Sequence, residues 1–177
     1  MSIRKHSHET IKSSRPGELA LLHADRRPVF VIADNIRSLH NVGSLFRTSE
    51  AAGIEKLYLA GITGTPPRKE IAKTAIGAEN NVPWEHHPDI IPVLEYFKSQ
   101  HIPIIALEHT SASVNFQEAD YHFPLCLVIG NEVEGISEEV LAYADAAVEI
   151  PMFGMKQSLN VAVAYGIMVY ELVRRLA

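Results

Sequence analysis

Continuous apolar runs alternate along the chain with segments whose apolar residues recur at helical spacing. Such runs are typical of strands that a sheet buries on both faces. The sequence predicts strands at residues 28–33, 56–60, 82–85, 102–107, 124–129 and 146–150. The third is expected at an edge of the sheet, because Pro83 has no backbone N–H to donate to a neighbouring strand.

Helical spacing and capping residues place helices between these strands. The sequence predicts helices at residues 42–52, 68–75 and 89–99, one that begins after Ser137, and a long one from Ser158 to Arg174–Arg175. Asn41 and Ser158 are the expected N-caps of the first and last of these helices, and Gly53 is the expected stop of the first. This alternation predicts an α/β fold, a mostly parallel sheet with helices on both faces.

The predicted C-terminal helix is apolar nearly all round from residue 159 to residue 173. A helix with this pattern must be buried on more than one side. We expect the sheet to cover one side and a second subunit to cover the other.

Charge is unevenly distributed along the chain. Its 177 residues are 47% hydrophobic and 21% charged, which is ordinary for one globular domain. The net charge of −5 argues mildly against a nucleic-acid partner. Residues 1–27, however, carry six basic and three acidic side chains, and Arg68, Lys69 and Lys73 form a second basic cluster. These residues are either solvated surface charges or a local phosphate-binding patch.

No segment reads as a signal for export or as a membrane span. The first ten residues lack an apolar core, and the apolar stretch 161–170 is too short to cross a bilayer. The single cysteine, Cys126, excludes an intramolecular disulfide and is expected to be a buried hydrophobe. The histidines lack metal-ligand spacing, so we expect no metal. We therefore expect a soluble, cytoplasmic protein, with residues 1–26 as a basic arm or short helix and residues 27–177 as the domain.

Three segments set polar groups at the end of an apolar run or at the start of a helix, where α/β sheets bind ligands. In the first, Gly43 and Arg47 share a helix face just after Asn41. A glycine inside a helix usually marks the close approach of another group. Arg47 either meets a phosphate or ribose there, or forms a surface pair with Glu50.

The other two segments lie in the second half of the chain. Residues 130–135 directly follow a predicted strand. Their two glycines permit either a plain polar turn or a close approach of the backbone to a ligand. In the second case Glu132 is exposed and can orient an arginine or a hydroxyl. Ser158 opens the last helix, and Asn160 lies in an apolar sequence where a buried amide would need partners.

Together these segments resemble the three motifs of the SpoU/TrmH-type RNA ribose methyltransferases of the SPOUT superfamily. The motifs read Asn41-x-Gly43-x-x-x-Arg47-Thr48 closing with Gly53, then Ile129-Gly130-Asn131-Glu132-x-x-Gly135, then Ile150-Pro151-Met152-x-Gly154 followed by Ser158-Leu159-Asn160-Val161. Each motif alone is weak, but the set is specific and covers about residues 27–177 in order.

The resemblance implies an α/β fold with a deep C-terminal trefoil knot, and a homodimer through the C-terminal helix. It also implies that S-adenosylmethionine lies in the knot, in a pocket lined by Leu107, Gly130, Ile150 and Leu159. The implied reaction transfers the methyl group to a ribose 2′-hydroxyl of RNA. The implied catalytic residues are Arg47, Asn41, Glu132, Ser158 and Asn160. Arginine keeps its proton above pH ~12, so an electrostatic role for Arg47 is physically easier than that of a general base.

The chain is short for this family and shows no large RNA-binding domain, so the RNA would be read by the dimer surface, the arm and the basic residues at 68–73. A tRNA is the favoured substrate and ribosomal RNA the second choice. One alternative is a catalytically silent RNA-binding protein of the same fold, but all five implied catalytic residues are present. Another is a different α/β nucleotide-binding enzyme, which the missing phosphate-binding glycine fingerprint disfavours.

Overall fold

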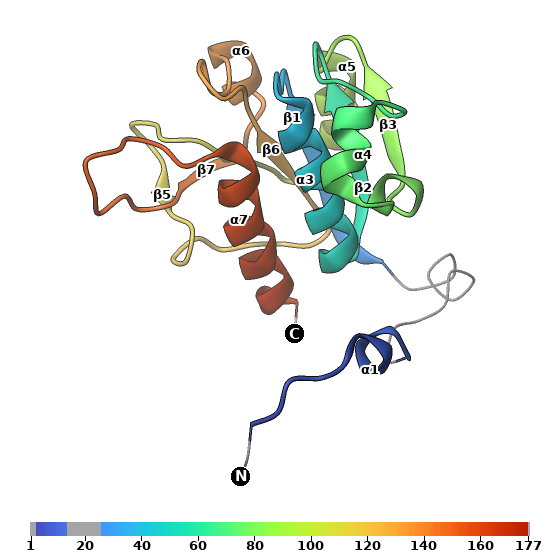
Figure 1. The fold of residues 1–177 in the computed structure, drawn as a ribbon. Helices are drawn as coiled ribbons and strands as arrows, with labels where there is room; N and C mark the ends of the chain where they lie inside the picture. The colour runs from blue at the N-terminus through green and yellow to red at the C-terminus, as the bar shows by residue number, and fades with distance from the viewer. Residues whose placement is uncertain (1–2, 14–25, 177) are drawn as a thin grey trace.

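A computed structural model describes residues 3–13 and 26–176 of the chain (Figure 1). Its helices are α1 (His8–Ser13), α3 (Leu39–Ala52), α4 (Lys69–Ala75), α5 (Ile91–Ser99), α6 (Glu138–Leu141) and α7 (Val161–Arg175), with a 3-10 turn η1 (Ala78–Asn80). Its strands are β1 (Arg27–Asp34), β2 (Ile54–Ala60), β3 (Trp84–His87), β4 (Ile104–Leu107), β5 (Val114–Asn115), β6 (Leu125–Ile129) and β7 (Ala146–Glu149). The expected N-terminal arm contains the short helix α1, and its residues 14–25 lie outside the described residues.

The described strands form one seven-stranded sheet in the order β3-β2-β1-β6-β4-β7-β5. Every neighbouring pair is parallel. The predicted mostly parallel sheet is therefore confirmed, and β3 lies at an edge as predicted. The strand begins at Trp84, two residues later than predicted, so Pro83 precedes it. The two-residue strand β5 at the other edge was not predicted from the sequence.

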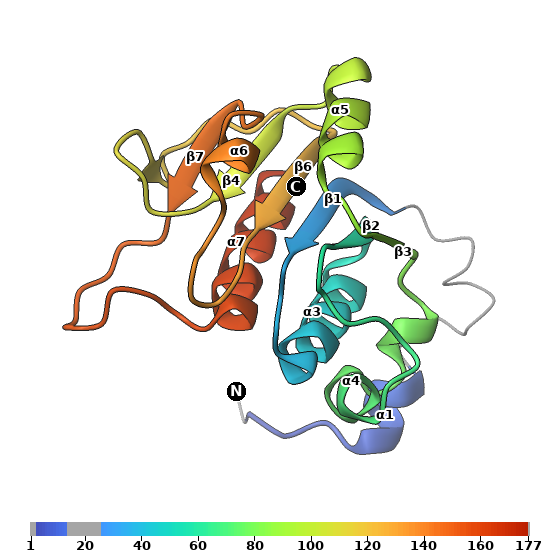
Figure 2. The same ribbon diagram turned by 90° about the horizontal axis from the view of Figure 1, so that it is seen from above.

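Both faces of the sheet are covered by helices (Figures 1 and 2). In β1, Val29, Val31 and Ala33 pack with α3, α4 and α7, whereas Ile32 between them packs with α5 and α6. The same alternation in β2, β4 and β6 explains their continuous apolar runs, because successive side chains of a strand point to opposite faces and both faces are core. Cys126 of β6 is buried as expected, and burial raises the pKa of its thiol.

The structure corrects two predicted helix starts. Ser38, and not Asn41, caps α3, because its side chain accepts the N–H of Asn41 at 3.3 Å. Asn160, and not Ser158, caps α7, because its side-chain oxygen accepts the N–H of Ala162 at 2.9 Å. Gly53 does end α3, with a positive φ of 66° that a glycine adopts at little cost.

Helix α4 packs closely on α3 at Gly43. A Cβ atom at Gly43 would lie 2.1 Å from Thr74 Oγ1 and 2.3 Å from the carbonyl oxygen of Ile71. The close approach that a helical glycine indicated is therefore that of α4. Thr74 Oγ1 also donates to the carbonyl oxygen of His40 at 2.9 Å, which fixes the two helices together.

Helix α7 has one buried face and one exposed face. Tyr165, Met168 and Leu172 are fully buried, and the hydroxyls of Tyr165 and Ser49 of α3 share a hydrogen bond of 2.8 Å. Val163, Ile167 and Tyr170 are large apolar side chains on the exposed face. The prediction that one face of this helix packs in the core of the domain is confirmed. The second subunit and the trefoil knot stay predictions. No helix within residues 3–13 and 26–176 is long and apolar enough to cross a membrane.

Candidate functional site

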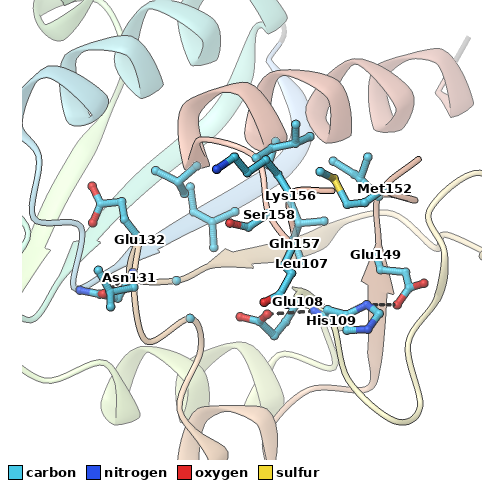
Figure 3. Close-up of a pocket in the computed structure, with 18 of the residues that line it drawn as sticks. Leu107, Glu108, His109, Asn131, Glu132, Glu149, Met152, Lys156, Gln157 and Ser158 are labelled. Atoms are coloured by element: carbon cyan, nitrogen blue, oxygen red, sulfur yellow. Dashed lines mark hydrogen bonds and ion pairs between the residues drawn. The ribbon is translucent and has the colours of Figure 1, made fainter. Parts of the chain in front are cut away.

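A pocket of about 900 Å³ lies at the carboxyl ends of β4, β6 and β7 (Figure 3). Its walls come from residues 107–109 at the end of β4, residues 129–135 at the end of β6, residues 149–152 and 154–159 at the end of β7, and the start of α7. These segments are far apart in sequence, and the parallel sheet brings them together because it ends its strands at one edge.

All four residues expected to hold a cofactor line this pocket: Leu107, Gly130, Ile150 and Leu159. Glu132 and Ser158, two of the expected catalytic residues, line it as well. Figure 3 places Glu132 at one end of the pocket and Glu149 at the other. The wall therefore combines apolar side chains with carboxylates at its rim.

The turn after β6 is built by its glycines and by Asn131. A Cβ atom at Gly130 would lie 2.5 Å from the carbonyl carbon of Gly135, so the turn closes only because Gly130 lacks one. Asn131 and Gly135 exchange two backbone hydrogen bonds of 3.0 and 3.1 Å. The Asn131 side chain donates to the carbonyl oxygen of Asn35 at 2.8 Å, which ties the turn to the end of β1.

The turn directs Glu132 at the residues just before and within the first turn of α3. Its Oε2 accepts the N–H of Arg37 at 3.0 Å, and its Oε1 accepts the N–H of Ser38 at 3.1 Å and Asn41 Nδ2 at 2.8 Å. Burial raises the pKa of Glu132, but the donors at Arg37, Asn41 and Ser38 outweigh burial and lower it. Glu132 is thus an ionised acceptor that holds α3 in place.

A further hydrogen bond joins Asn41 to the third segment. Asn160 Nδ2 donates to Asn41 Oδ1 at 3.1 Å. One hydrogen-bonded network therefore connects all three sequence segments, from Glu132 through Asn41 to Asn160. The amide of Asn160 is exposed and partnered, not buried as its apolar sequence indicated.

Arg47 is not part of this hydrogen-bonded network. Its side chain is exposed and makes no hydrogen bond or ion pair with any residue in 3–13 or 26–176. Neither the surface pair with Glu50, one of the two alternatives for Arg47, nor a direct contact with Glu132 is formed within those ranges. A guanidinium on the surface, with all its donors facing solvent, is free to bind an anion.

The segment from residue 151 to residue 159, the β7–α7 loop, is held only at its ends. Its residues make no hydrogen bond with any other described residue, and all of them beyond Pro151 are exposed. Met152, Met155, Lys156 and Gln157 from this loop line the pocket. The backbone amides of this loop therefore have no partner among the described residues and are free to bond to solvent or to a ligand.

Sequence reasoning missed a group of polar residues at the other side of the pocket. Glu108 Oε2 accepts the N–H of Ile136 at 2.9 Å, which braces the turn after β6 from the end of β4. His109 Nδ1 lies 2.7 Å from Glu149 Oε2, and the same oxygen accepts Ser113 Oγ at 2.6 Å. An acidic residue directly after an apolar strand was the one available signal for Glu108, and its partners are visible only in the fold.

The pocket can hold a ligand with a flat apolar part and polar ends, since apolar side chains and free amides line it. No group of three His, Cys, Asp or Glu side chains suited to a metal ion occurs in the described part of the chain.

The sequence matches the family model of the SpoU rRNA Methylase family over residues 28–170.

Known proteins of similar sequence and structure are RNA-modifying enzymes, in agreement with the family model. The chain is 37% identical to the tRNA (guanosine(18)-2′-O)-methyltransferase of Aquifex aeolicus over 155 residues, 88% of this chain and 73% of that protein. A crystal structure of the A. aeolicus TrmH/SpoU tRNA modifying enzyme superposes with a TM-score of 0.80 at 37% identity, covering 89% of this chain and 80% of that one. An AdoMet-bound rRNA methyltransferase from Sinorhizobium meliloti superposes with a TM-score of 0.79 at 31% identity. This match covers 84% of this chain but only 57% of the S. meliloti chain.

The match spans the fold, the pocket and all three motif segments. The chain belongs to the SpoU rRNA methylase family.

Proposed function

We propose that this protein transfers a methyl group from S-adenosylmethionine to a ribose 2′-hydroxyl of tRNA. The observation that carries the proposal is the chain from Glu132 through Asn41 to Asn160, which unites the three motif segments at the rim of the pocket. The A. aeolicus relative is named for this reaction on tRNA. Ribosomal RNA is the second choice, because the S. meliloti relative is an rRNA methyltransferase.

The residues of the pocket fit S-adenosylmethionine. Leu107, Ile150 and Leu159 offer the apolar walls that an adenine needs, and the free amides of the β7–α7 loop offer donors for its polar edge. Gly130 also lines the pocket, and its lack of a Cβ atom lets the turn after β6 close against Gly135. When bound, the donor would supply an electrophilic methyl group on its sulfonium, so the protein mainly has to align the ribose hydroxyl, whose proton would pass to solvent water.

Arg47 orients and neutralises the RNA at the reaction centre. It is exposed and unpaired in the described chain, so its guanidinium is available for a phosphate next to the target ribose. A guanidinium offers donors and no acceptor, so the contribution of Arg47 is electrostatic. Ser158 and Asn160 contact the ribose or its phosphate. The Asn41 side chain binds RNA through the second N–H of its amide, because its two hydrogen bonds to Glu132 and Asn160 leave that donor free.

The RNA lies across the basic surface beside α3 and α4. Arg68, Lys69 and Lys73 are exposed, and none forms an ion pair within the described residues. Their charge complements a phosphate backbone although the whole chain is acidic. Residues 27–177 form the catalytic domain in this proposal, and residues 1–26 add a basic arm.

The active protein is a homodimer through α7. The exposed apolar side chains Val163, Ile167 and Tyr170 follow one another at helical spacing, and a second copy would cover them. We place the protein in the cytoplasm, where a reducing environment suits its lone buried thiol.

Calorimetry and a methyl-transfer assay test the proposal together. The protein should bind S-adenosylmethionine and methylate a pool of unmodified tRNA transcripts. Arg47→Ala should abolish transfer and leave the affinity for S-adenosylmethionine largely intact, because Arg47 lies outside the residues that line the pocket. No binding at millimolar ligand would refute the proposal, and full activity of Arg47→Ala would remove Arg47 from the mechanism.

A further inference from the structure

The β7–α7 loop carries two large apolar side chains that nothing in the described chain covers. Phe153 is 98% exposed and Met155 is 100% exposed. Both flank Gly154, at which an added Cβ atom would meet no atom within 4 Å. Figures 1 and 2 show the loop extending away from the sheet and from α3 and α4. An aromatic ring and a thioether held in water beside a pocket mark a surface that meets a partner.

The charge of the loop favours a nucleic acid as this partner. Lys156 follows Met155 directly, is exposed and forms no ion pair with a described residue. No aspartate or glutamate occurs from residue 150 to residue 170, in a chain whose net charge is −5. Phe153 lies three residues before Lys156. An aromatic residue close to basic side chains is the combination that proteins use to bind unpaired nucleotides.

The position of the loop also favours this partner. The loop leads directly to Ser158 and Asn160, the residues that we place at the reacting ribose. Asn160 is fixed to Asn41 by the 3.1 Å hydrogen bond, so the end of the loop is anchored at the reaction centre while Phe153 reaches outward. An unpaired nucleotide can turn its ribose toward a methyl donor in a pocket, and an unstacked base exposes a face on which an aromatic ring can stack.

We propose that Phe153 stacks on an unpaired base of the RNA substrate, with Met155 beside it and Lys156 on a neighbouring phosphate. The inference rests on the proposed function and assigns Phe153 as a positioning residue of the RNA. Sequence variation at this position of the loop would then alter which nucleotide is presented, without altering the cofactor pocket.

Kinetics of Phe153→Ala test this assignment. The variant should lower kcat/KM for tRNA transcripts by roughly five- to hundredfold through a higher KM for RNA, the usual cost of losing one base–aromatic contact. Phe153→Trp should restore most of the loss, and its fluorescence should change when RNA is added. Tyr96→Ala, which removes an exposed aromatic ring on α5, should leave kcat/KM unchanged.

Binding of S-adenosylmethionine and sedimentation of Phe153→Ala complete the test. Both should match the wild type. An unchanged kcat/KM for RNA would overturn the assignment. A weaker affinity for S-adenosylmethionine would overturn it in favour of the cofactor pocket, and a monomeric variant would overturn it in favour of the subunit interface. A wild-type protein that methylates no RNA would instead refute the proposed function.

Discussion

Glu132 is held by its neighbours and serves as a fixed anchor. Its carboxylate accepts two backbone N–H groups and the amide of Asn41, and these donors lower its pKa. A carboxylate at the start of a helix is also favoured by the helix dipole. A group with a lowered pKa is a poor proton acceptor near neutral pH. We therefore infer that Glu132 serves to fix Asn41 and the start of α3.

Glu132→Gln tests this role. One carboxamide atom becomes a donor that faces the N–H of Arg37 or Ser38, so the free energy of unfolding should fall by about 1–3 kcal/mol. Methyl transfer should fall as well, because Asn41 loses its charged partner. The pKa of Glu132 is lower in the folded protein than in the unfolded chain, where it is about 4.3. Its carboxylate therefore stabilises the wild type above this pH, and the stabilisation is lost as the pH falls through the pKa of the folded state.

Urea unfolding between pH 7 and pH 3 measures both effects. The difference in stability between wild type and Glu132→Gln should be largest at pH 7 and shrink on acidification. Glu118→Gln is the matched control, because the Glu118 carboxylate is exposed and has no side-chain partner among the described residues. Equal stability of Glu132→Gln and Glu118→Gln at neutral pH would contradict the anchoring role.

The candidate residues could be read from the sequence, whereas their partners could not. Gly130, Glu132 and Asn160 stood out because polar or small residues interrupted apolar patterns. The capping assignments at Asn41 and Ser158 were wrong, since several good capping residues lie within three positions of each helix start. The choice among them depends on Glu132, which lies 91 positions away from Asn41 and engages its amide.

At the scale of elements, the contact of α3 with α4 positions the basic surface. Gly43 lets the backbone of α4 approach, and α4 carries Lys69 and Lys73. Gly43→Ala would place a methyl group 2.3 Å from the carbonyl oxygen of Ile71, and a backbone atom cannot yield without moving the helix. The free energy of unfolding should fall by about 1–3 kcal/mol, and the affinity for tRNA should weaken.

Thermal unfolding and tRNA binding by filter retention measure these changes. Ser44→Ala at the next position is the control, because Ser44 Oγ bonds only the carbonyl oxygen of His40 in its own helix. It should change stability by less than about 0.5 kcal/mol. A Gly43→Ala protein as stable as Ser44→Ala would show that α4 does not depend on this close contact.

Most strands and helices were predictable because their apolar patterns are strong, as in the buried runs of β1 and β6. The two-residue strand β5 and the single turn η1 were not, since elements of this length carry no periodic signal. The order of strands was beyond local patterns. Strand β4 lies between β6 and β7, which follow it in sequence, and only the folded sheet places their ends around one pocket.

At the scale of the whole molecule, the exposed face of α7 predicts dimerisation. Ile167→Glu would place a charge in the middle of the stripe formed with Val163 and Tyr170, where a partner would have to desolvate it. The variant should sediment as a monomer and lose methyl transfer, while the wild type sediments as a dimer. Analytical ultracentrifugation measures the difference.

Val114→Glu is the control for this change, because Val114 is an exposed apolar residue on the edge strand β5. It should sediment like the wild type. A monomeric wild-type protein, or a dimeric Ile167→Glu variant, would contradict an interface through α7.

The pocket and the hydrogen-bonded residues Glu132, Asn41 and Asn160 are proposed to serve methyl transfer to ribose. Nucleoside mass spectrometry of tRNA transcripts incubated with the protein and S-adenosylmethionine tests it most directly. We predict one 2′-O-methylated nucleoside that is absent when Arg47→Ala replaces the wild type. A methyl group on a base, or RNA left unmethylated by protein that binds S-adenosylmethionine, would contradict the account.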